Sequence, residues 1–178
     1  MNTGQMIMVL GALMLLSMLS LSVNSMFIDK TTTMLDAEAN LNGISIAQSM
    51  IDEIMVKSYD ASTVSAKVYT SATFNAPGAF GPNGTESSNV PQPDTSNPFK
   101  SVKYYNDVDD YHLYRRTVFN PRLGNFTVVD SVYYVQETSP NTVSNVATFH
   151  KKVVVTVTHK NMVRPLTMSD VAVYRRYF

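Results

Sequence analysis

The sequence contains no cysteine and no tryptophan among its 178 residues, and no charged side chain before Asp29. Without cysteine, disulfides cannot stabilise the chain, and thiol-redox chemistry and cysteine-based zinc or haem attachment are excluded. The net charge is zero and no basic run occurs, so the sequence predicts no nucleic-acid partner. It also lacks a nucleophile elbow, a phosphate-binding loop and a metalloprotease motif, and we therefore expect no enzymatic activity.

What the sequence does have is a strongly apolar segment at residues 1–28. As a helix this segment would be about 42 Å long, and a membrane-spanning helix needs about 20 apolar residues. No Lys or Arg precedes the apolar run, so we expect a retained membrane anchor or assembly helix rather than a removed signal peptide. Its four serines are small enough to let helix backbones approach closely. A simple membrane anchor that happens to contain serines is the alternative.

The helical pattern continues through residues 29–60. Apolar residues recur every three or four positions, which predicts one buried face of an amphipathic helix. This predicted face consists of Met34, Ala37, Leu41, Ile44, Ala47, Ile51 and Ile54. The first proline is Pro77, so one helix can run from near the N-terminus to about Tyr59.

Residues 61–178 are predicted to form a β-rich globular head. An irregular loop at 75–100 holds five of the eight prolines. Beyond it, four segments rich in Val, Thr, Tyr and Phe predict strands. These segments are Leu113–Phe119, Phe126–Gln136, Ala147–His159 and Val171–Tyr177. The third predicted strand has one apolar face, interrupted at Lys151, that carries Phe149, Val153, Val155 and Val157.

These elements predict an α+β fold, in which a long N-terminal α-helix with an apolar first half packs on a C-terminal antiparallel sheet of about four strands. The apolar faces of the helix and of the third strand have matching periods of 3.6 and 2, and each needs an apolar partner. We therefore expect the helix face that includes Ile51 to cover the sheet face that includes Val155.

Charge is unevenly distributed along the chain. Residues 29–60 carry six acidic and two basic side chains, whereas the segment from Lys151 onward carries six basic side chains and one acid, Asp170. Both regions can simply be solvated faces. Alternatively, the acidic helix of one subunit meets the basic C-terminal surface of another, because complementary potentials set partner choice and register.

An acidic element gathers possible metal ligands. Asn106, Asp107, Asp109 and Asp110 offer oxygen atoms of the kind that calcium prefers, although the full calcium-loop pattern is missing. The sequence therefore suggests a calcium site at Asp107, Asp109 and Asp110 and no other cofactor. The alternative is an acidic turn that pairs with Arg115 or Arg116.

Two further surface features are open to modification or binding. Asn83-Gly84-Thr85 and Asn125-Phe126-Thr127 match the acceptor pattern for N-glycans, so Asn83 and Asn125 are candidate glycosylation sites. Six tyrosines can line a carbohydrate-binding surface or pack against the helix, and packing explains most of them better. They are Tyr104, Tyr105, Tyr111, Tyr114, Tyr133 and Tyr134.

The layout resembles that of the type IV pilin and pseudopilin superfamily, and especially of minor-pilin-like members with an Asp-Asp-Tyr element and a late Val-x-Val-x-Val strand. In this chain those elements are Asp107-Val108-Asp109-Asp110-Tyr111 and Lys151-Lys152-Val153-Val154-Val155-Thr156-Val157. The resemblance covers the whole chain in layout, and in sequence the first thirty residues and these two patches. It implies that the N-terminal helices bundle into a filament core. The implied core residues are Met6, Ile7, Val9, Leu10, Leu13 and Leu16.

Two departures from the family pattern are visible. Family members usually carry Glu at the fifth residue, where it pairs with the N-terminal amine of a neighbouring subunit, but the residue here is Gln5. The resemblance thus implies an inter-subunit contact in which an amide bonds the amine without neutralising its charge. No short charged leader ending in Gly is visible either. We expect that such a leader is already missing from this sequence or that this lineage does without one.

The resemblance implies a structural subunit of an extracellular type IV pilus-like filament. Such a subunit resides in the cytoplasmic membrane before assembly and has copies of itself and the pilus or secretion machinery as partners. Two alternatives stay open: a membrane-anchored extracytoplasmic binding module, and a minor pseudopilin of a secretion or pilus machine.

Overall fold

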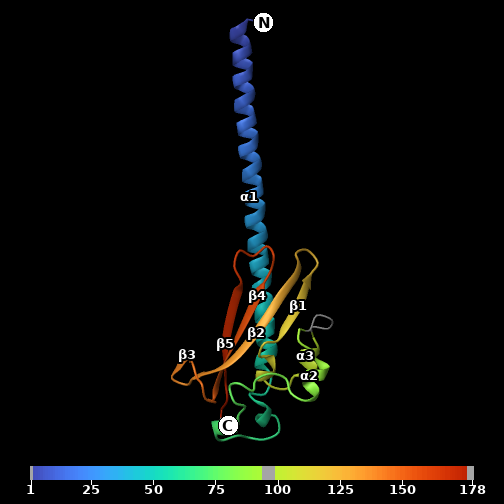
Figure 1. Cartoon of the computed structure of the whole chain (residues 1–178), viewed down its shortest axis with the longest axis vertical. Coiled ribbons are helices and arrows are strands. Elements are labelled where there is room, and N and C mark those ends of the chain that lie inside the picture. Colours follow the sequence, from blue (N-terminus) through green and yellow to red (C-terminus); the bar gives the residue numbers. More distant parts are fainter. Residues whose placement is uncertain (1, 94–98, 176–178) are drawn as a thin grey trace. The chain divides into compact units, whose positions relative to one another are not determined.

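The structure is a computed structural model that describes residues 2–93 and 99–175 (Figure 1). Its longest element is helix α1, Thr3–Met55. Two short helices follow, α2 at Thr85–Asn89 and α3 at Lys100–Tyr104. Single 3-10 turns occur at Ala61–Thr63, Ser71–Thr73 and Asp109–Tyr111. The strands are β1 (Arg115–Asn120), β2 (Gly124–Gln136), β3 (Ser139–Val143), β4 (His150–Thr158) and β5 (Leu166–Val173).

The strands form one antiparallel sheet in the order β1-β2-β4-β5, with β3 paired to the end of β2. Strand β2 is the longest and pairs with β1 on one side and β4 on the other. The structure therefore confirms the α+β class, a long N-terminal helix packed on an antiparallel sheet, with five strands rather than four.

The described chain divides into two compact units between Glu38 and Ala39, inside the predicted 29–60 segment. In the first unit, residues 3–38 are all part of α1. Every large apolar side chain from Met6 to Ile28 is exposed in this chain. By length and composition, α1 is able to cross a membrane.

The second unit contains the rest of α1, the loops and the sheet. The inner face of β2 carries Phe126, Val128, Val132 and Tyr134, all fully buried. Facing residues of β4 alternate in the same way, and Val153, Val155 and Val157 are also fully buried. Six residues of α1 are buried over this sheet: Ala39, Gly43, Ala47, Met50, Ile51 and Ile54.

The predicted buried face of the helix is partly wrong. Ala47, Ile51 and Ile54 are buried as expected, but the other four predicted residues are exposed, Leu41 at 69%, Ile44 at 45% and Met34 at 56%, together with Ala37. The reason is a close approach of helix to sheet. A Cβ atom added at Gly43 would clash with the end of Met162 and lie 3.3 Å from Leu166 Cδ2. Small residues therefore line this contact, and the bulky Leu41 and Ile44 face outward.

Other boundaries also differ from expectation. Helix α1 ends at Met55 rather than near Tyr59, and the predicted loop at 75–100 contains the short helix α2. Residues 94–98 of that loop lie outside the described residues. Strand β3 was not predicted, because Ser139-Pro140-Asn141 reads as a turn and Pro belongs on sheet edges.

Candidate functional site

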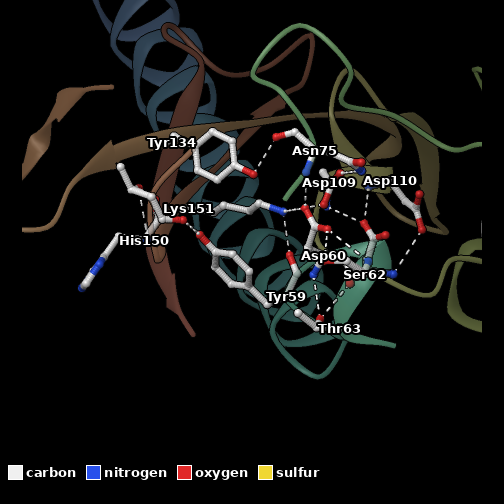
Figure 2. Close-up of polar contacts among 12 residues, drawn as sticks. Tyr59, Asp60, Ser62, Thr63, Asn75, Asp109, Asp110, Tyr134, His150 and Lys151 are labelled. Atoms are coloured by element: carbon white, nitrogen blue, oxygen red, sulfur yellow. Dashed lines mark hydrogen bonds and ion pairs between the residues drawn. The ribbon is translucent and has the colours of Figure 1, made fainter. Parts of the chain in front are cut away.

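A lysine is buried in the core of the second unit, Ala39–Phe178, which we call the head from here on. Lys151 lies on the inner face of β4, in the alternating row that continues as Val153 and Val155, and its Cα is paired with that of Tyr134 on β2. Its side chain is completely buried, and its Nζ donates to Tyr59 O at 2.7 Å, Asp60 Oδ2 at 3.1 Å and Asp109 Oδ1 at 2.5 Å. Both carboxylates are buried as well. Figure 2 shows the lysine side chain pointing at these carboxylates.

The chain that follows α1 positions Asp60. This residue is the N-cap of the 3-10 turn Ala61–Thr63, and its Oδ1 accepts from the backbone N–H and the hydroxyl of Ser62. Its Oδ2 accepts from the Asn75 backbone N–H at 2.9 Å. Burial alone would raise the pKa of Asp60, but the ammonium of Lys151 and these hydrogen bonds hold it below its usual value. Asp60 is therefore an anion in the head.

Asn75 connects the remaining parts of the site. Its side-chain amide donates to Asp109 Oδ2 at 2.7 Å, and its backbone carbonyl accepts from the Tyr134 hydroxyl at 2.8 Å. We call Lys151, Tyr59, Asp60, Asn75, Asp109 and Tyr134 the Lys151 cluster. The cluster joins the segment after α1, two loops and two strands.

Aromatic rings enclose the ammonium group. Lys151 Nζ lies 4.5 Å from the ring centroid of Tyr59, 5.3 Å from that of Phe80 and 5.4 Å from that of Tyr134. Such rings attract a cation through their quadrupoles. Burial raises the pKa of the Tyr59 and Tyr134 hydroxyls, so both stay protonated. The Tyr59 hydroxyl donates to Thr148 O.

Next to the cluster, the acidic element folds into a tight turn. Asp107 Oδ1 accepts from the backbone N–H groups of Asp109 at 3.0 Å and Asp110 at 3.2 Å, and Asp110 Oδ2 accepts from those of Asn106 and Asp107. Burial, with the charge of Asp109 and hydrogen bonding to it, raises the pKa of Asp107 to about 9. Burial also raises the pKa of Asp110, to about 6, against the effect of its backbone donors.

This geometry does not support the predicted calcium site at Asp107, Asp109 and Asp110. Asp109 forms an ion pair with Lys151, and the other two carboxyls accept backbone hydrogen bonds. Within residues 2–93 and 99–175, no group of three His, Cys, Asp or Glu side chains is placed to hold a metal ion. The alternative of an acidic turn is correct, but its cation is Lys151, not Arg115 or Arg116.

A second buried ion pair ties α1 to β1. Arg116 NH1 lies 2.6 Å from Glu53 Oε2, and Glu53 Oε1 accepts from the hydroxyls of Ser101 at 2.5 Å and Tyr111 at 2.9 Å. We call these four residues the Glu53 cluster. Nearby, Asp130 on β2 is completely buried, and neither of its carboxyl oxygens has a hydrogen-bond partner among the described residues. Burial raises the pKa of Asp130 well above its usual value, as does Glu53, while Arg116 opposes the shift.

The two clusters change the interpretation of the uneven charge. Glu53 and Asp60 from the acidic segment, and Lys151 from the basic segment, form ion pairs inside one chain. They are therefore not available to attract a second subunit. Of the six basic side chains from Lys151 onward, Arg176 lies outside the described residues. Sequence reasoning missed both clusters. For the Lys151 cluster the sequence offered one signal, a lysine on an otherwise apolar strand face.

The candidate assembly surface is the first unit of α1. The predicted core residues are all at least half exposed in this chain: Met6, Ile7, Val9, Leu10, Leu13 and Leu16. Gln5 is exposed too, and its Oε1 accepts from the Asn2 backbone N–H at 3.3 Å.

The remaining candidates lie on the head. Asn83 and Asn125 are exposed, so both predicted glycosylation sites are accessible, and their modification stays a prediction. Four of the six tyrosines are buried, which confirms that packing accounts for most of them: Tyr105, Tyr111, Tyr114 and Tyr134. The first three contact one another edge to face.

The arrangement shown by the structure is thus a long apolar N-terminal helix on an antiparallel sheet with two buried ionic clusters. Comparisons with the models of known protein families, with curated proteins and with solved structures found no match to this chain.

Proposed function

We propose that this protein is a structural subunit of a type IV pilus-like extracellular filament and that it assembles through α1. The observation that carries the proposal is the exposed apolar surface of α1 from Met6 to Ile28, which extends around the helix. A helix that is apolar all round is stable only inside a membrane or a packed core. Each large apolar side chain left in water forfeits about 1.5–3 kcal/mol.

Hydroxyl groups along the same helix are bonded within the helix. Ser17 Oγ donates to Leu13 O at 2.8 Å, Ser25 Oγ to Ser22 O at 2.9 Å, and Thr31 Oγ1 to Phe27 O at 2.8 Å. Such bonds let a polar side chain leave water at little cost, because its donor is already satisfied. Small residues also let neighbouring helices approach closely. Both properties suit a helix that exchanges lipid for sister helices.

The α+β head supports assignment to the pilin superfamily at the level of architecture. In the proposal, the chain resides in the cytoplasmic membrane before assembly and then enters a polymer of identical copies with the help of pilus or secretion machinery. The head folds around its own core, so it forms the outside of the filament. The role is structural rather than catalytic.

The test is Leu13→Asp in the full-length protein. A carboxylate at the centre of a helix bundle costs several kcal/mol, so we expect filaments to be lost while thermal unfolding of the head is unchanged. Val146→Asp is the matched control, because Val146 is 67% exposed, against 54% for Leu13, but lies on the head. It should leave assembly intact. Electron microscopy and sedimentation after detergent removal measure the outcome.

Other outcomes distinguish the alternatives. Wild-type protein that stays as single copies in vesicles, with no polymer, would identify a membrane-anchored extracytoplasmic module. Short assemblies that form only with another pilin would identify a minor pseudopilin. Normal filaments from Leu13→Asp would overturn the role of α1 as the filament core.

A further inference from the structure

Inside the Lys151 cluster, an amine and a carboxyl group are held together away from water. Lys151 Nζ lies 2.5 Å from Asp109 Oδ1, and both side chains are no more than 1% exposed. We propose that Lys151 and Asp109 join through an amide bond between their side chains, an intramolecular isopeptide that cross-links β4 to the Asp107–Asp110 turn. The proposal goes beyond the filament function and holds whether the protein polymerises or not.

Asp109 is a better acyl partner than Asp60. Asp60 is farther from the amine, at 3.1 Å, and its oxygens also accept from Ser62 and the Asn75 backbone, which stabilise the unreactive carboxylate. Asp109 Oδ2 instead accepts one hydrogen bond, 2.7 Å long, from the Asn75 side-chain amide. That donor is placed to stabilise the negative charge that develops on this oxygen when the amine attacks.

Asp107 is placed to move a proton. Its Oδ1 accepts from the Asp109 backbone N–H at 3.0 Å, and the two carboxyl groups are close enough for the charge of Asp109 to raise the pKa of Asp107. Because that pKa is about 9, Asp107 carries a proton at neutral pH. A buried carboxylic acid beside a reacting carboxyl is a general acid with a proton to donate.

The reaction balances without any outside reactant. Transfer of one proton from the Lys151 ammonium to the Asp109 carboxylate, across their 2.5 Å contact, gives the free amine and the carboxylic acid that react. The amine nitrogen then attacks Asp109 Cγ. Asp107 donates its proton to the departing hydroxyl, which leaves as water, and the attacking nitrogen releases one proton to Asp60 Oδ2, which lies 3.1 Å away. One C–N bond forms, one C–O bond breaks, and no group is oxidised or reduced.

Two features of the site favour condensation over hydrolysis. The fold holds both groups in contact, which replaces a bimolecular encounter by an intramolecular one. The rings of Tyr59, Phe80 and Tyr134 surround the nitrogen and exclude the water needed to reverse the reaction.

The test is mass spectrometry of the full-length purified protein. We expect an intact mass lower than the sequence mass by one water molecule. Trypsin should yield a branched peptide that joins residues 104–115 to residues 123–152, because cleavage after a modified Lys151 is blocked. The branched peptide separates an isopeptide from a succinimide at an aspartate, which also loses water but joins no second peptide.

Variants sharpen the assignment. Lys151→Met should restore the mass expected from its sequence, whereas Lys152→Met should keep the cross-link, because Lys152 Nζ contacts Asn141 outside the cluster. Asp107→Asn keeps an acceptor for the backbone N–H groups but cannot transfer a proton, so the cross-linked fraction should fall severalfold. Full sequence mass in folded wild-type protein, with separate peptides 104–115 and 123–151, would overturn the proposal.

Discussion

The two units of this chain place apolar and charged groups in opposite ways. In the first unit, α1 exposes every large apolar side chain from Met6 to Ile28. In the second unit, apolar side chains are buried and several charged groups are buried with them, including Lys151, Glu53 and Arg116. A chain of this size would ordinarily bury its apolar surface and solvate its charges.

The contrast indicates which part of the molecule is complete by itself. The head supplies the buried Lys151 nitrogen with three acceptors and pairs Arg116 with the Glu53 carboxylate, so the main partners of both groups lie within the second unit. In the first unit, the Ser17, Ser25 and Thr31 hydroxyls bond carbonyls of the same helix, but the large apolar side chains from Met6 to Ile28 are exposed among the described residues. Folding therefore belongs to the second unit, and in the proposed function assembly belongs to the first.

The largest expected effect on the head comes from breaking the Glu53 cluster. Glu53→Ala removes the partner of Arg116 and the acceptor for the Ser101 and Tyr111 hydroxyls. Removing one member of a buried ion pair typically costs about 3–5 kcal/mol. Asp52→Ala is the matched control, since Asp52 is exposed and should change the free energy of unfolding by at most about 0.5 kcal/mol. Denaturant titration measures both, and a cost for Glu53→Ala below 1 kcal/mol would show that Arg116 pairs again with Asp130.

A second comparison lies on one helix. Ile51→Ala should destabilise the head by about 2–5 kcal/mol, because Ile51 is only 4% exposed and its loss leaves a cavity. Leu41→Ala, at a position that is 69% exposed, should change the unfolding free energy by about 0.5 kcal/mol or less. Equal losses for the two variants would mean that Leu41 is covered in the folded head. Chemical denaturation of the Ile51→Ala and Leu41→Ala variants measures the two changes in unfolding free energy.

The same helix shows what sequence pattern can and cannot predict. Periodicity located a helix and a sheet-facing side, because apolar residues recurred every three or four positions. It placed Leu41 and Ile44 on that side because their bulk dominates the hydropathy signal. The contact is instead built around Ala39, Gly43 and Ala47, which fit between helix and sheet because their side chains are small. A close helix-to-sheet distance is a tertiary property that local pattern does not contain.

The Lys151 cluster was harder to predict for a different reason. The alternating pattern of the strand placed Lys151 on its apolar face. A single lysine in that position was interpreted as an interruption of the face and not as part of a site. Its partners, Asp60 and Asp109, lie 91 and 42 residues away in sequence, so only the folded topology brings them together. The Asp107–Asp110 element was recognised as a feature, but the sequence did not indicate that its Asp109 pairs with Lys151.

A smaller and pH-dependent effect is expected from Asp130→Asn. Because burial raises the pKa of Asp130 in the folded protein, the folded state holds a proton that the unfolded state loses above about pH 4. Its contribution to stability is therefore full below pH 4 and is lost as pH rises toward the folded pKa. The variant should show a shallower decline of unfolding free energy above pH 4, by up to about 1.4 kcal/mol per pH unit.

The measurement compares denaturant titrations of wild type and variant across the pH range. Asp107 and Asp110, whose pKa values are also raised, contribute in the same direction, while His112, with a lowered pKa, opposes them. These groups are common to both proteins, so the difference between the two profiles isolates Asp130. Parallel profiles would show that Asp130 is ionised in the folded head.

The smallest effect is expected at Gln5, in the unit through which the protein is proposed to assemble. Gln5 is neutral, and in this chain its side-chain oxygen accepts one weak hydrogen bond from Asn2 N–H. Burying an amide in a helix bundle gives at most a modest gain, about 0.5–1.5 kcal/mol per hydrogen bond. Gln5→Leu should thus assemble to within a fewfold of the wild-type yield, measured by sedimentation beside the non-assembling Leu13→Asp. Complete loss of polymers from Gln5→Leu would show instead that this amide makes an indispensable contact to the amine of a neighbouring subunit.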